Sequence, residues 1–130
     1  MNIFAPIDGS ECSTRALRFA AEMTRNFDAS LHVVHFTDEE TDATDAILDN
    51  AREILDENGI QTEPELSTDV RLEFRPAERV GKDILDLVEQ RGYDHVVMGH
   101  HGSGAVERAI VGSAAETVLR SEKVSVTVVP

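Results

Sequence analysis

The chain has 130 residues, 12 basic and 25 acidic side chains, one cysteine and a formal net charge of −13. This length predicts a single domain over residues 1–130, and 41% hydrophobic residues are enough for a core, which excludes global disorder. The charge disfavours nucleic-acid binding, and no stretch has the ~18 consecutive apolar residues of a membrane helix. Residues 1–7 lack the basic flank and long apolar run of a signal peptide, so we expect a cytoplasmic protein.

The kind of charge is also informative. Only Lys82 and Lys123 are lysines, the other ten basic residues are arginines, and the acidic residues are spread along the whole chain. Such a surface resembles that of proteins from extreme halophiles, because at molar salt the Debye length falls to ~3 Å and acidic groups repel each other little. We therefore expect a halophilic protein, with an ordinary acidic mesophilic protein as the alternative.

Strand and helix patterns alternate along the chain. Ser10 is the expected N-cap of the first helix, Asn58-Gly59 and Arg91-Gly92 are expected to end the second and third, and a capping box from Ser113 to Glu116 is expected to open the fourth. Pro6 counts against a central position for the first strand, because it has no N–H for the sheet. The predicted strands are 2–7, 31–36, 70–74, 95–98 and 125–129, and the predicted helices are about 12–26, 42–58, 80–90 and 113–120.

Strands separated by helices of this length pair in parallel, with helices on both faces of the sheet. The predicted fold class is therefore α/β, a doubly wound open sheet of five parallel strands. In such sheets ligands bind beyond the carboxyl ends of the strands, where the winding reverses. Two of those ends carry polar and glycine residues here, namely Asp8-Gly9-Ser10 and Gly99-His100-His101-Gly102.

The segment after the fourth predicted strand reads GHHGSGAVERAIVGSAAE from Gly99 onward. Gly112 and Ser113 fall at a helix start, where free N–H groups and the helix dipole favour an anion. Arg108 is the strong cation of the segment and can bind a phosphate through two hydrogen bonds. The pattern predicts a polyphosphate site, although the Walker A and Rossmann glycine patterns are absent. The alternative is that these glycines serve only a turn and helix packing.

These residues resemble the ATP-binding universal stress proteins. The spacing Gly99-x2-Gly102-x9-Gly112-Ser113 is similar to the phosphate motif of that family, G-2x-G-9x-G-(S/T). The start IFAPIDGSECSTRALRFA resembles the family's first strand and helix, YDHVVMGHHGSG its fourth strand and SVTVVP its last. The resemblance spans essentially the whole chain, is weakest from Thr37 to Pro76, and implies the strand order 3-2-1-4-5. Pro6 is usual in the family, which removes the objection to the first strand.

The resemblance also implies roles for individual residues. Asp8 matches a carboxylate that contacts the ribose, and the backbone of Phe36 matches a contact with the adenine. Arg108 falls on a position that is often basic in the family. The phosphate motif corresponds to Gly99, Gly102, Gly112 and Ser113, with the amides of His101, Ser103 and Gly104 inside it.

Other polar residues favour less specific interpretations. His100 and His101 are neighbours and are more readily exposed loop residues than metal ligands, while His32 and His35 point to opposite faces of one strand. Cys12 is more readily a packing residue than a reactive thiol. We therefore predict no metal bound by side chains.

The sequence predicts an ATP-binding or adenine-nucleotide-binding stress-response module, with Mg²⁺ or Mn²⁺ bound through the phosphates to offset the acidic charge. Any ATP hydrolysis is expected to be slow. The alternatives are a nucleotide-using enzyme on the same fold, such as a slow ATPase or an adenylyltransferase, and a dimeric adaptor without nucleotide. A homodimer is expected through the last strand, Ser125 to Val129, because an exposed apolar sheet edge favours pairing with its twin. The resemblance implies the same pairing, although Ser125 stands where the family often has proline.

Overall fold

The computed structural model describes residues 1–37, 40–68, 76–101 and 111–130. Strands and helices alternate through these ranges, as the sequence predicts. The strands are β1 (Asn2–Ile7), β2 (Ser30–Phe36), β3 (Glu65–Ser67), β4 (His95–Gly99) and β5 (Ser125–Val129). The helices are α1 (Glu11–Phe27), α2 (Asp42–Glu57), α3 (Pro76–Arg91) and α4 (Ser113–Arg120). Within these ranges, none of the helices combines the length and the apolar character that crossing a bilayer requires.

The strands form one parallel sheet in the order β3-β2-β1-β4-β5, which confirms the predicted fold class and strand order. β1 is central although it contains Pro6. The register between β1 and β4 pairs Ile3 with His95 and Phe4 with Val96, both before Pro6. Pro6 itself has no N–H to donate to a neighbouring strand.

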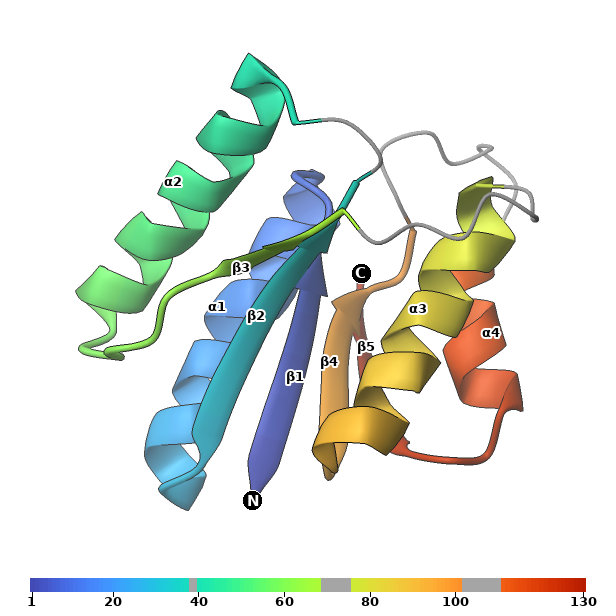
Figure 1. Cartoon of the computed structure of the whole chain (residues 1–130). Helices are drawn as coiled ribbons and strands as arrows, with labels where there is room; N and C mark the ends of the chain where they lie inside the picture. Colours follow the sequence, from blue (N-terminus) through green and yellow to red (C-terminus); the bar gives the residue numbers. More distant parts are fainter. Residues whose placement is uncertain (38–39, 69–75, 102–110) are drawn as a thin grey trace.

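Each face of the sheet is covered by two helices (Figure 1). Alternate residues of the strands point to opposite faces, so Ile3 and Ala5 pack with α1 and α2, whereas Phe4 packs with α3 and α4. Val126 and Val128 of β5 likewise pack toward α3 and α4, and Val129 packs toward α1 and α2. The chain thus buries two apolar layers, one on each side of β1.

Three predicted boundaries need correction or comment. The third strand is Glu65–Ser67, earlier than predicted, and the predicted range 70–74 lies outside the described residues. The third helix begins at Pro76 rather than near Val80, consistent with the preference of proline for the first helical position. The predicted capping box of the fourth helix is wrong. Gly112, with extended φ and ψ of −68° and 160°, is its N-cap, and Ser113 is the first helical residue.

Candidate functional site

A pocket lies at the carboxyl ends of the central strands, where the winding of the sheet reverses between β1 and β4. Its volume is about 170 Å³, which exceeds the small voids of an ordinary packed core. Residues from three strand ends and three helices meet around it. They are Pro6, Ile7, Asp8, Ser13, Phe36, Val80, Ile84, Met98, Gly99, His101, Gly112, Ser113, Ala114 and Ala115.

Asp8 is held in place by the turn between β1 and α1. Its carboxylate accepts a hydrogen bond from the backbone N–H of Ser10 at 2.9 Å, and its own N–H donates to the Ser13 hydroxyl at 3.1 Å. Ser10 is the N-cap of α1, as predicted, and accepts from the Ser13 N–H. Gly9 has φ of +82°, which glycine adopts without strain. The turn therefore fixes a half-buried carboxylate at the pocket edge.

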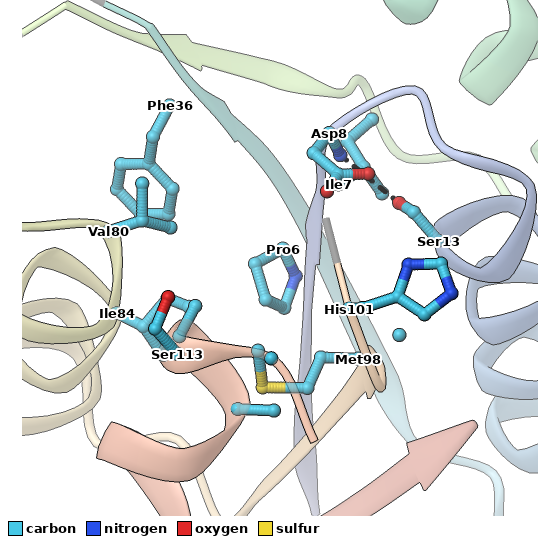
Figure 2. Close-up of a pocket in the computed structure, with 14 residues that line it drawn as sticks. Pro6, Ile7, Asp8, Ser13, Phe36, Val80, Ile84, Met98, His101 and Ser113 are labelled. Carbon is cyan, nitrogen blue, oxygen red and sulfur yellow. Dashed lines mark hydrogen bonds between the residues drawn. The ribbon is translucent and has the colours of Figure 1, made fainter. Parts of the chain in front are cut away.

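One side of the pocket is apolar. Figure 2 shows Phe36 and Val80 on the side opposite Asp8, Ser13 and His101. Phe36 ends β2, and its ring meets the Phe4 ring edge to face, with centroids 6.4 Å apart. Ile84 and Met98 continue this surface toward the sheet. An apolar wall beside a fixed carboxylate suits a flat ring attached to a polyhydroxy group.

Another part of the pocket wall is formed by the start of α4. The first N–H groups of a helix have no partner inside the helix, and Gly112 offers no side chain to cap them. Ser113, Ala114 and Ala115 of this first turn line the pocket. Their backbone groups and the helix dipole suit an anion such as a phosphate. The residues present therefore fit a nucleotide.

Two glycines permit the close packing around this end. A Cβ on Gly99 would lie 2.7 Å from the Cys12 Sγ and 3.0 Å from the Ser13 nitrogen. A Cβ on Gly112 would lie 2.8 Å from the His101 Cα. The Gly112 N–H also donates to the His100 carbonyl. At these two positions glycine is therefore required by the packing of the protein itself, in addition to any requirement from a ligand.

The structure brings together six of the ten predicted site residues in this one pocket, namely Asp8, Phe36, Gly99, His101, Gly112 and Ser113. The other four, Gly102, Ser103, Gly104 and Arg108, lie outside the described residues. Among the described lining residues there is no lysine or arginine, and Asp8 is the one charged carboxylate.

Several lining residues were missed in the sequence. Val80 and Ile84 are four apart on α3 and so share a helix face, a signal that was present but assigned only to the core. Ser13 lies three residues after the N-cap Ser10, the spacing of a helix start. Met98 directly precedes Gly99, and its part in the pocket follows from the sheet register rather than from a motif.

His32 and His35 point to opposite faces of β2, as predicted. The His32 ring lies against the Tyr93 ring, with centroids 5.1 Å apart, while the His35 Nδ1 is 2.7 Å from the Ile7 carbonyl on the other face. These two side chains therefore do not meet.

A doubly wound parallel sheet with a pocket at its reversal and a glycine-capped helix start defines a class of α/β proteins that hold small ligands at this edge. The whole chain, residues 1–130, matches the model of the universal stress protein family, so the chain belongs to this family. This match confirms the resemblance found in the sequence.

Related proteins agree with this assignment. The chain is 26% identical to universal stress protein MJ0531 of Methanocaldococcus jannaschii, over 98% of this chain and 80% of the relative. The structure of a universal stress protein from Archaeoglobus fulgidus covers all of this chain and 93% of its own, with 25% identity and a TM-score of 0.75. A second structure from A. fulgidus, a universal stress protein in complex with dAMP, shares the fold with 23% identity and a TM-score of 0.73, covering 100% of this chain and 98% of its own.

Proposed function

We propose that this chain is a cytoplasmic binding module for an adenine nucleotide, with ATP carrying Mg²⁺ or Mn²⁺ as the ligand. The observation that carries the proposal is that the first turn of α4 and the ends of β1 and β2 line one pocket. This places an anion-binding group, a carboxylate and an apolar wall around a single space. The A. fulgidus protein with bound dAMP supports an adenine nucleotide as the ligand class.

Each part of the nucleotide has a matching group in the proposal. The adenine would pack against Phe36 and Val80, and the Asp8 carboxylate would accept hydrogen bonds from the ribose. The phosphates would meet the N–H groups of Ser113 and the residues that follow it. The predicted phosphate contacts of Gly102, Ser103, Gly104 and Arg108 remain part of the proposal, and Arg108 would add a positive charge.

The chain would act by binding and by responding to the nucleotide rather than by turning it over. Backbone N–H groups hold a bound phosphate well. Holding the substrate and the transition state equally does not accelerate the chemical step. We also propose, from the excess of 25 acidic over 12 basic residues, that binding takes place at high salt.

Isothermal titration calorimetry with ATP and Mg²⁺ in molar KCl tests the proposal. Replacing Asp8 with Asn keeps an acceptor for the Ser10 N–H but removes the charge, and should weaken ATP binding about tenfold, because a hydrogen bond to a charged group contributes ~1.5–3 kcal/mol. The matched control is Asp56→Asn, the same change on an exposed residue near the end of α2, which does not line the pocket. Absence of ATP binding to the wild type, or equal weakening by both variants, contradicts the proposal.

A homodimer through β5 completes the proposal. β5 is an edge of the sheet, and its backbone can pair with a second copy. Ser125 keeps a backbone N–H that proline would lack, so the first residue of the strand can also take part. Light scattering in molar KCl should give twice the mass of one chain at micromolar concentration, and the mass of a single chain would refute the dimer.

A further inference from the structure

Three side chains of types that can ligate a metal ion meet beside the pocket, at the junction of α1 and β4. They are Cys12 in the first turn of α1 and His100 and His101 directly after β4. Each can offer one ligand atom, and these atoms lie within 4.8 Å of one another. Cys12 and His101 are 89 positions apart in the sequence, so only the fold brings them together.

The donor atoms are placed for a shared ligand. The Cys12 Sγ lies 3.9 Å from the His101 Nδ1, and the two imidazole rings have centroids 4.0 Å apart. In a tetrahedral zinc site, bond lengths of ~2.3 Å to sulfur and ~2.0–2.1 Å to nitrogen separate the ligand atoms by ~3.3–3.7 Å. The Cys12–His101 pair is thus close to the separation that a zinc ion imposes, and all three atoms lie within about 1.5 Å of such separations.

His100 supplies an independent reason to look for a ligand. Its Nδ1 is buried and has no hydrogen-bond partner among the described residues. A buried polar atom without a partner is unfavourable and calls for an explanation. Cys12 is 1% exposed, and its thiol donates to the His101 carbonyl at 2.8 Å. A metal ion bound through His100 Nδ1 would give this nitrogen a partner.

We propose that Cys12, His100 and His101 form a binding site for a soft divalent cation of the zinc class, with a fourth position left for water or a ligand. One thiolate and two imidazoles are the donor set that zinc and similar metals prefer over Mg²⁺ or Mn²⁺. The site is therefore chemically distinct from a cation carried by nucleotide phosphates. The proposal takes up the alternative to the expectation that Cys12 is a packing residue and that the two histidines are exposed loop residues.

Binding is balanced by the loss of one proton. The Cys12 thiol releases its proton to solvent, a sulfur–zinc bond forms, and both imidazoles bind as neutral rings. The His101 carbonyl loses its thiol donor, which is a cost that the three metal bonds must exceed. Protons compete with the metal for all three donors, so the affinity should fall as the pH is lowered.

The site adjoins the pocket because His101 lines both. A zinc ion with one thiolate leaves a net positive charge of one beside the start of α4. Such a charge would attract the phosphates of a nucleotide held in the pocket. This consequence rests on the proposed function, whereas the metal site itself does not.

The test uses Co²⁺ and Zn²⁺ with the whole chain and no nucleotide, so that its failure is separate from failure of the proposed function. Wild-type protein should bind one Co²⁺ per chain and show the near-ultraviolet charge-transfer absorption of a cobalt–thiolate bond, which Zn²⁺ then displaces. Cys12→Ser, whose hydroxyl can still donate to the His101 carbonyl, should lose this absorption. His100→Asn should lower the Zn²⁺ affinity at least tenfold, since even outer partners of a metal ligand are worth about 10–100-fold.

The control is His32→Asn, which removes a histidine that packs against Tyr93 away from the cluster and should leave Co²⁺ binding unchanged. Thermal melts of all variants show whether each is folded. Wild-type protein without the charge-transfer absorption overturns the proposal. So does Co²⁺ binding that both Cys12→Ser and His100→Asn retain at wild-type affinity.

Discussion

The backbone of His101 lies directly against Gly112, so that a Cβ built on Gly112 would be 2.8 Å from the His101 Cα. The nearest obstacle is backbone, and the His100 carbonyl oxygen follows at 3.0 Å. The loop after β4 and the start of α4 are thereby held in contact at the pocket. A side chain at position 112 changes this packing before it meets any ligand.

We expect Gly112→Ala to lower the free energy of unfolding by about 1–3 kcal/mol, because overpacking against backbone forces a local shift. Urea denaturation followed by circular dichroism measures the change. Ser113→Ala, one residue further on and exposed, is the control and should change stability by less than about 0.5 kcal/mol. Equal stability of wild type and Gly112→Ala would show that the loop and helix separate freely.

The parallel sheet and much of the site could be predicted from the sequence, for a physical reason. Apolar runs such as Asn2–Ile7 and Leu31 to Phe36 mark buried parallel strands, and parallel strands end at one edge. Asp8 and Gly99 could therefore be assigned to one edge from the sequence alone, and the resemblance to the family added Phe36. The match of the family motif extended this assignment to Gly112 and Ser113.

What the sequence could not predict depends on tertiary contacts. β3 has only three residues, Glu65–Ser67, at the exposed edge of the sheet, and its pairing with Val34 to Phe36 selects the strand rather than its own propensity. The predicted capping box at Ser113 is wrong because Gly112, one residue earlier, is the N-cap of α4. The meeting of Cys12 with His101 depends on how α1 packs on β4, which no local pattern encodes.

ATP binding should depend on a divalent cation at low salt. The net charge of −13 repels a triphosphate, and no lysine or arginine lines the described part of the pocket. Chelation by EDTA should weaken ATP binding about tenfold or more at low salt and less in molar KCl, where charges are screened. Calorimetry with Mg²⁺ added back in excess of EDTA provides the control, and equal affinity under all conditions contradicts this expectation.

ATP hydrolysis should be slower than about 1 s⁻¹, below the usual range of enzymes. Fast phosphoryl transfer needs cations around the transferred group and a residue that orients the attacking water. The described pocket offers backbone N–H groups, Asp8 and His101, of which Asp8 already accepts the Ser10 N–H. A single-turnover assay with Mg²⁺ measures the rate. Faster hydrolysis that is lost in His100→Ala or His101→Ala would instead indicate an enzyme.

The end of α3 is joined to the edge strand by an ion pair. Arg91 donates two hydrogen bonds to the Glu65 carboxylate, at 2.7 and 2.8 Å, and these bonds hold the pKa of Glu65 below its usual value. Both side chains are partly exposed, so Glu65→Gln should cost only about 0.5–1 kcal/mol at low salt and less in molar KCl. The pair contributes above about pH 4.5 and is lost as the pH falls through the lowered pKa.

Urea denaturation of Glu65→Gln at low and molar KCl measures this contribution. The matched control is Glu53→Gln on the exposed face of α2, where stability should hardly change. A loss in Glu65→Gln that is the same at both salt concentrations would mean that the carboxylate acts through packing rather than through its charge.

His95 should make the stability of the fold sensitive to mild acid. It lies at the start of β4 with its Nε2 2.8 Å from the Thr127 hydroxyl, and burial lowers the pKa of its imidazole below the ordinary value of about 6.5. The unfolded chain therefore binds a proton at a higher pH than the folded chain does. The stabilisation by neutral His95 is complete above about pH 6.5 and is lost as the pH falls through the lowered folded pKa.

Substituting His95 with Gln, which can still bond to Thr127 but does not titrate, should flatten part of this dependence. Melting temperatures of the wild type and of His95→Gln, measured between about pH 7.5 and pH 5, should differ progressively as the pH is lowered, with the wild type falling faster. His32→Gln is the control for the loss of a histidine on another strand of the sheet, β2, where the His32 ring packs against Tyr93. Melting temperatures of the wild type and of His95→Gln that fall in parallel with pH would contradict this prediction. The pH dependence would then come from another group, because the two proteins differ only at position 95.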